Sequence, residues 1–262
     1  MDEPATVAAH VWSAFSSMHA KSSVYHELIE AMAHPGCPIC QIVDRAVRQY
    51  VDAFFYESMT NVERRAEIRT ARGYCSVHGA LLVGHSRMLG TAIIQHDVIN
   101  DVLREVNRIL LPTAPHNAEP ALPRRPRLWE RLDFSLLRRT LLEAIRPKRI
   151  CPLCEYEEGQ EHMLLRTLVN EFHEVEIRQA FAHSSGLCLP HLQTLLRLRE
   201  TNPRSLRLLL QVERDILQAL KAELDEYLVK SNGSYEYEGM GREADAPLRA
   251  VKIVSGRVFG RR

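Results

Sequence analysis

The chain has 262 residues, of which 45% are hydrophobic and 26% charged, and its formal net charge is +1 at pH 7. This composition is typical of a globular protein, and the length allows one large domain or two of common size. The near-neutral charge argues against bulk attraction to nucleic acid or to an anionic membrane. No apolar run reaches the roughly 18 residues that a membrane-spanning helix needs, so no membrane partner is expected.

The first half of the chain contains two cysteine motifs within a helical pattern. The first motif reads CPIC at 37–40, and its proline suits the first turn of a helix, where a missing N–H costs nothing. Apolar residues then recur at helical spacing from Ile42 to Phe55. The second motif, GYCSVH at 73–78, predicts a turn and a helix start, because glycine permits backbone conformations that other residues resist. An amphipathic run continues from Val77 to Leu110.

A proline-rich stretch at 112–127 predicts a linker between the two halves. From Leu122 to Ile150, nine Arg or Lys residues stand against three acids. This stretch indicates either a solvated helix face or a patch that binds nucleic acid or phosphate. Charge runs are usually solvated faces, and only Trp129 and Phe134 interleave with the charges, so we favour the solvated face.

The second half repeats the pattern of the first. CPLC at 151–154 is followed by GLCLPH at 186–191, with 33 residues between Cys154 and Cys188 against 34 between Cys40 and Cys75. ELIEAM at 27–32 precedes the first CPxC, and TLLEAI at 140–145 precedes the second. Such duplication predicts two similar units: a first metal-binding repeat at 1–111, and a second at 128–230 beyond the linker. A helical run from His191 to Leu228 is interrupted near Pro203.

The C-terminal tail at 231–262 has a different character. It opens on SNGS, a turn pattern, and YEYE at 235–238 alternates as a strand does. Residues 246–255 predict a short last helix. The expected fold class is therefore all-α: two pseudo-repeated, zinc-stapled helical units packed together, with a short irregular or β-like C-terminal tail.

All six cysteines belong to the repeated motifs, and each repeat offers three thiolates and one imidazole. This is the ligand set of a closed tetrahedral zinc site, so we expect two structural Zn²⁺ ions. Pairing within each repeat gives the two expected sites: Cys37, Cys40, Cys75 and His78, and Cys151, Cys154, Cys188 and His191. A swap, in which each C-x-x-C pairs with the C-x-x-H of the other repeat, stays open.

The cysteines allow three interpretations other than zinc ligands. A disulfide framework suits small secreted domains, whereas this chain is long and opens without a signal-peptide pattern. A thioredoxin-like dithiol expects a βαβ pattern, but the pattern here is helical. An iron–sulfur cluster also binds thiolates and can accept histidine, so it remains the alternative metal centre.

The motifs YHELIEAM, GCPIC, GYCSVHG, ICPLC and GLCLPHL, with the late APLRAVKIVSG, resemble an uncharacterised prokaryotic family, domain-of-unknown-function family 6062. The resemblance runs from about Val24 to Gly256. It implies a two-site, cysteine-rich helical protein and supplies no activity.

The sequence contains no Walker loop, G-x-G-x-x-G, G-x-S-x-G or H-E-x-x-H motif, so no catalytic residue is expected. An enzyme that lacks a local motif stays open as an alternative. Metal-binding thiols and the lack of a signal peptide favour the cytoplasm. The leading hypothesis is a cytoplasmic scaffold or adaptor that binds another protein. The alternatives are a redox- or metal-responsive regulator that contacts nucleic acid, and an iron–sulfur protein.

Overall fold

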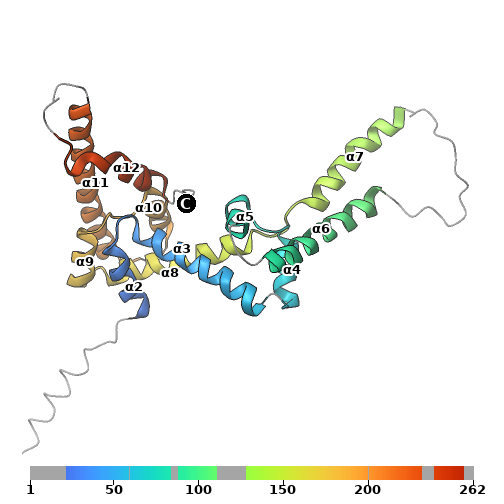
Figure 1. Cartoon of the computed structure of the whole chain (residues 1–262), viewed down its shortest axis with the longest axis horizontal. Helices are drawn as coiled ribbons and strands as arrows, with labels where there is room; N and C mark the ends of the chain where they lie inside the picture. Colours follow the sequence, from blue (N-terminus) through green and yellow to red (C-terminus); the bar gives the residue numbers. More distant parts are fainter. Residues whose placement is uncertain are drawn as a thin grey trace, which may run out of the picture. The chain divides into compact units, whose positions relative to one another are not determined.

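A computed structural model of the chain describes residues 22–58, 60–83, 88–110, 128–199, 201–231 and 239–256, which are largely helical and contain no strand (Figure 1). The predicted all-α class is confirmed for this part of the chain. No helix in these ranges combines the length and the apolar character needed to cross a membrane. The elements in chain order are α2 (Ser23–Met32), α3 (Pro38–Ala53), a π-helix (Phe54–Ser58), α4 (Val62–Thr70), α5 (Ser76–Val83), α6 (Met88–Leu110), α7 (Leu128–Ile145), α8 (Pro152–Glu171), α9 (Val175–Ala182), α10 (Leu189–Arg197), α11 (Pro203–Ser231), a 3-10 turn η2 (Arg242–Asp245) and α12 (Ala246–Ser255).

The helix starts follow from local sequence. Both C-P-x-C prolines open helices, α3 at Pro38 and α8 at Pro152, as predicted. The C-x-x-H motifs open α5 and α10, and the break before Pro203 separates α10 from α11. Polar side chains cap other starts: the side chain of Asn61 accepts a hydrogen bond from the Arg64 backbone N–H at 3.0 Å, which satisfies an otherwise unpaired donor of α4.

The predicted tail is helical where the structure describes it. Residues 246–255 form α12, as expected from the sequence. The strand-like segment at 235–238 lies outside the described residues.

The chain divides into two compact units. One consists of residues 1–45 and 160–262 and is called the terminal unit here; the other consists of residues 46–159 and is called the central unit. Each unit contains segments from both halves of the sequence. The repeat boundaries at 1–111 and 128–230 therefore remain a prediction about sequence duplication, and the packing units are composed differently.

The core of the terminal unit is made by α2, α8, α9 and α10. Phe172 and Phe181 are fully buried and meet edge to face, with ring centroids 5.5 Å apart. The Tyr25 hydroxyl donates to Glu176 Oε2 at 2.9 Å, which joins α2 to α9. The Gly36 N–H donates to Ser185 Oγ at 2.9 Å. This hydrogen bond joins the turn before the CPIC motif to the turn before the GLCLPH motif.

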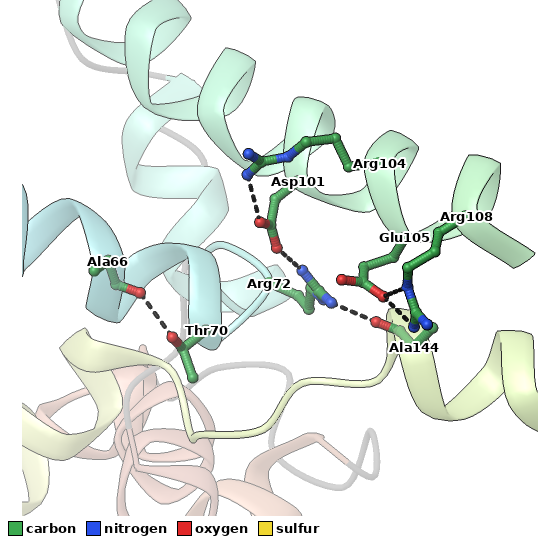
Figure 2. Close-up of polar contacts among 8 residues, drawn as sticks. All are labelled: Ala66, Thr70, Arg72, Asp101, Arg104, Glu105, Arg108 and Ala144. Carbon is green, nitrogen blue, oxygen red and sulfur yellow. Dashed lines mark hydrogen bonds and ion pairs between the residues drawn. The ribbon is translucent and has the colours of Figure 1, made fainter. Parts of the chain in front are cut away.

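In the central unit, Arg72 joins three segments (Figure 2). Its guanidinium donates to Asp101 on α6 and to the carbonyl oxygen of Ala144 on α7, and its own backbone follows α4 with a left-handed φ of 56°. Arg104 reaches the same aspartate at 2.9 Å. Burial raises the pKa of Asp101, but the two arginines outweigh burial, so its pKa is lowered and it stays ionised.

The glycine before each C-x-x-H motif has the backbone conformation that was predicted for it. Gly73 has φ +91° and Gly186 has φ +70°, values that side chains resist. A Cβ on Gly186 would also lie 2.8 Å from Glu213 Oε2, so the Glu213 carboxylate would have to shift to admit a side chain. This position therefore favours glycine for two separate reasons.

Glu213 on α11 is a buried carboxyl group with an exposed fraction of 2%. Its Oε2 accepts a hydrogen bond from the Leu187 backbone N–H at 2.9 Å, and no described group bonds to Oε1. Burial raises the pKa of Glu213 to about 7; the Leu187 bond lowers it in part, and Cys188 raises it slightly.

Glu213→Gln is expected to change the pH dependence of stability. Because the folded-state pKa lies above that of an unfolded glutamate, the stabilising proton is fully bound below about pH 4.5 and is lost as the pH rises through 7. The variant's unfolding free energy, relative to the parent's, should therefore rise by about 2 to 3 kcal/mol between pH 5 and pH 8. Denaturant titrations of both proteins at the two pH values measure this difference. If the unfolding free energies of the two proteins change equally between pH 5 and pH 8, the raised pKa assigned to Glu213 is wrong.

Candidate metal centres

The eight predicted ligand residues come together in two clusters. Cys37, Cys40, Cys188 and His191 form the terminal centre, and Cys75, His78, Cys151 and Cys154 form the central centre. Within each cluster the four ligand atoms lie within 4.8 Å of one another, close enough to hold one metal ion. All six cysteines are reduced, and none lies outside these clusters.

Pairing within each repeat, as expected from the sequence, is wrong. The terminal centre joins the first C-x-x-C to the second C-x-x-H, and the central centre joins the second C-x-x-C to the first C-x-x-H. Helix lengths give the reason. The 16 residues of α3 span about 24 Å, whereas the 9 residues of α4 span only about 13 Å. In the second repeat, the 20 residues of α8 span about 30 Å and the 8 of α9 about 12 Å.

A returning helix of half the outgoing length cannot bring the C-x-x-H motif back to the start of its own repeat. The motif is therefore left away from its own C-x-x-C, and the C-x-x-C of the other repeat completes the ligand set. The two repeats are interleaved through their metal ligands as a result.

The ligand spacing in the terminal centre fits one tetrahedral ion. Two thiolates at the usual zinc–sulfur distance of about 2.3 Å should lie about 3.8 Å apart. The Cys40 and Cys188 sulfurs are 3.6 Å apart. His191 directs Nδ1 at the three sulfurs, at 3.4 Å from Cys37, 3.3 Å from Cys40 and 3.0 Å from Cys188.

The central centre repeats this geometry. The Cys75 and Cys154 sulfurs are 3.6 Å apart. His78 Nδ1 lies 3.3 Å from each of them and 3.7 Å from the Cys151 sulfur. Both histidines thus present Nδ1 to the ligand cluster and leave Nε2 on the outer side of the ring.

The ligands carry a charge distribution suited to a cation. Burial lowers the pKa of His191, but the Cys188 and Cys40 thiols and Glu161 outweigh burial and raise it to about 11. Burial raises the pKa of Cys151, but a hydrogen bond from His78 and nearby backbone N–H groups lower it to about 6. Each cluster therefore favours one thiolate beside an imidazolium, whereas burial and neighbouring thiols raise the pKa of Cys37 and of Cys154; a metal ion would replace all of these protons.

A glutamate on α8 lies close to Nε2 of each histidine, the ring nitrogen that faces away from the sulfurs. Glu161 Oε1 lies 3.1 Å from His191 Nε2, and Glu157 Oε2 lies 3.2 Å from His78 Nε2. A neutral histidine that binds metal through Nδ1 carries its proton on Nε2, the atom that faces the carboxylate. Such a carboxylate orients the ring and increases its basicity, so Glu161 is positioned to strengthen metal binding, whereas Glu157 is close to His78 Nε2 but accepts no hydrogen bond from it.

These glutamates were not predicted as partners of the histidines, although the sequence contains a signal for them. Glu157 and Glu161 are three and seven residues after Cys154, on the helix that the cysteine motif opens. The matching positions after Cys40 are Val43 and Val47, which are buried in the core. Acidic residues in the first turns of a helix are common because they interact favourably with the helix dipole. This general role explains their presence without any histidine partner, so the sequence alone does not indicate the contact with the ligand histidines.

Glu161→Gln is expected to weaken metal binding in the terminal centre by about 10- to 100-fold, because an amide oxygen is a poorer acceptor for the ring N–H. Glu157→Gln should have a smaller effect in the central centre, because His78 Nε2 makes no hydrogen bond to Glu157. Competition with a coloured chelator measures the two affinities. Glu158→Gln is the matched control, since Glu158 is exposed on the same helix. If all three variants bind metal equally, the role assigned to the glutamates is wrong.

Two arginines of the basic stretch pair with acids within the central unit. Arg149 lies 2.6 Å from Glu155 and 3.3 Å from Glu67, and Arg146 lies 3.7 Å from Glu143. These pairs neutralise part of the positive charge that a nucleic acid would need. They support the solvated helix face for the described part of this stretch.

Comparison with known proteins gives a family but no activity. A model described as a family of unknown function (DUF6062) matches residues 25–260. An "Uncharacterized 23.9 kDa protein in xynA 3'region" of Caldicellulosiruptor sp. (strain Rt8B.4) is 24% identical over 238 residues, which cover 87% of this chain and 99% of that protein. No solved structure matches the chain significantly.

Proposed function

The chain belongs to DUF6062, a family of unknown function, and we propose that it is a cytoplasmic scaffold or adaptor in which two structural zinc ions stabilise a surface that binds another protein. The observation that carries this proposal is the closed ligand set of each centre. Four protein ligands surround one ion position, whereas a catalytic zinc usually keeps a coordination site open for water or substrate. Reduced thiols that all serve as ligands suit a reducing compartment.

Ligand type and spacing support zinc over an iron–sulfur cluster. Three thiolates and an imidazole are a zinc-preferring set. Sulfur–sulfur distances of 3.6 Å in both centres suit ligands of a single ion. A cluster of several irons would distribute its ligands over different metal atoms and hold them further apart.

Elemental analysis of protein purified without oxygen tests the metal. Two zinc ions per chain would support the proposal. Iron with acid-labile sulfide, together with a coloured protein, would refute the zinc assignment.

Exposed apolar side chains of the central unit support a protein partner. On α6, Ile99 and Leu103 are more than half exposed, and on α7 Phe134 and Leu142 are about 60% exposed. The two helices pack against each other within this unit. Exposed apolar side chains mark a protein-binding surface where they form a contiguous patch, and the proposed surface combines these four.

Affinity purification from the native host, at ordinary expression, tests the adaptor. A reproducible protein partner is expected with the parent chain and should be lost with Phe134→Ser/Leu142→Ser. Leu248→Ser/Val254→Ser is the matched control, because it removes two similarly exposed apolar groups from α12 of the other unit. Absence of any protein partner, together with metal-dependent turnover of a small molecule, would overturn the proposal.

The second candidate is a redox-responsive regulator. Its support is the half-buried state of Cys40, Cys75 and Cys154, since thiolates that oxidants reach can be oxidised with release of metal. Contact with nucleic acid has less support, because Arg146 and Arg149 near the central centre are paired with acids. A salt-dependent DNA or RNA shift that peroxide alters would favour this candidate over the adaptor.

A further inference from the structure

A cavity of about 690 Å³ lies within the terminal unit, apart from the metal ligands. It is lined by the turn between α2 and α3, by the end of α9, and by α11, η2 and α12. This volume falls in the range of sites that bind small molecules, about 300 to 1,000 Å³.

One wall of the cavity is an apolar strip on α11. Val212, Ile216 and Leu220 are spaced four residues apart, so they share one face of the helix and extend over about 12 Å. Met32 and Ile253, both buried, continue the apolar surface from α2 and α12. The strip has the length of an extended medium-length hydrocarbon chain.

The charged residues of the lining leave an excess of positive charge. Arg249 is paired with Glu223 and Asp245, and Asp215 accepts two hydrogen bonds from Arg214. Both acids of the lining are thus already neutralised by arginines.

Arg242 and Lys252 also line the cavity, and no carboxylate among the described residues pairs with either side chain. Three cations, Arg242, Arg249 and Lys252, stand against the two acids of the lining, which leaves a net formal charge of +1. A cavity with an apolar wall and two unpaired cations favours a ligand with an apolar body and a negative head.

We propose that this cavity binds a small amphipathic anion, a carboxylate with a medium-length hydrocarbon chain. The apolar chain lies along Val212, Ile216 and Leu220, and the carboxylate binds Arg242 and Lys252. Binding of this ligand goes beyond the adaptor function, and it depends neither on the metal nor on a protein partner.

Calorimetric titration of the full metal-loaded chain with sodium decanoate tests the proposal. Decanoate should bind with a stoichiometry of one. Acetate, which has the charge without the chain, and decanol, which has the chain without the charge, should each bind more weakly by about tenfold or more. Equal affinity for decanol and decanoate, or no binding of decanoate at millimolar concentration, would overturn the proposal.

Arg242→Ala/Lys252→Ala should weaken decanoate binding by about tenfold, because two ion pairs with the ligand are lost. Both side chains are exposed, so the fold should be retained. Lys221→Ala is the matched control, since it removes a cation from α11 outside the lining and should leave the affinity unchanged. Equal affinity in the double variant and the parent would show that the carboxylate does not bind at these cations.

Discussion

Replacing Cys40 and Cys75 together with serine is expected to remove both metal ions, whereas replacing Cys40 and Cys188 together should leave one ion bound. Cys40 and Cys188 belong to the terminal centre, and Cys75 belongs to the central centre. The first pair of substitutions therefore damages two centres and the second pair damages only one. Zinc content per chain, measured by elemental analysis, distinguishes the outcomes.

The three single variants serve as controls, and each should retain one metal ion. Pairing within the repeats gives the opposite result for the double variants, so that result would refute the interleaved arrangement. Stability should follow metal content. Each lost ion should cost on the order of 10 kcal/mol of folding free energy in its unit, which thermal unfolding would detect as a large drop in melting temperature.

Cutting the chain between the repeats is expected to leave its two halves bound to each other. A protease site inserted within 112–127 separates the first C-x-x-C and C-x-x-H motifs from the second pair. Because each centre takes ligands from both halves, two metal centres still link the fragments after cleavage. Size-exclusion chromatography should show one species that contains both fragments and two metal ions.

Chelation should then separate the fragments, since it removes the links contributed by the metal. The uncut chain treated with the same chelator is the control, because it should lose metal and stability but remain one polypeptide. Fragments that separate without chelator, each with one metal ion, would show that every repeat completes its own centre.

Features set by a few neighbouring residues were predicted from the sequence. The proline of each C-P-x-C motif marks the helix start at Pro38 or Pro152, and the glycines before the C-x-x-H motifs have positive φ. The last helix at 246–255 was also predicted. Each of these features depends on chemistry within one helical turn, which a single sequence displays directly.

The partners of each half-site could not be predicted in this way. The two arrangements use the same eight ligands and give the same ligand set, so motif spacing does not separate them. Which C-x-x-C motif combines with which C-x-x-H motif depends on the lengths of α3 and α8 before the chain turns back. These lengths are a property of tertiary packing. Glu157 and Glu161 were missed for a related reason: their role depends on histidines that are 30 residues or more away in the sequence.

The nested pairing also fixes the order in which a ribosome can supply the ligands. The central centre has all of its ligands once Cys154 has been synthesised, although its first ligand is Cys75. Cys40 appears earlier but must wait for Cys188, which is 148 residues further along the chain. At about 5 to 20 residues per second, this delay lasts about 7 to 30 s. The first cysteine pair to leave the ribosome is therefore the last to be enclosed, and it remains open to oxidation or to the wrong metal during that interval.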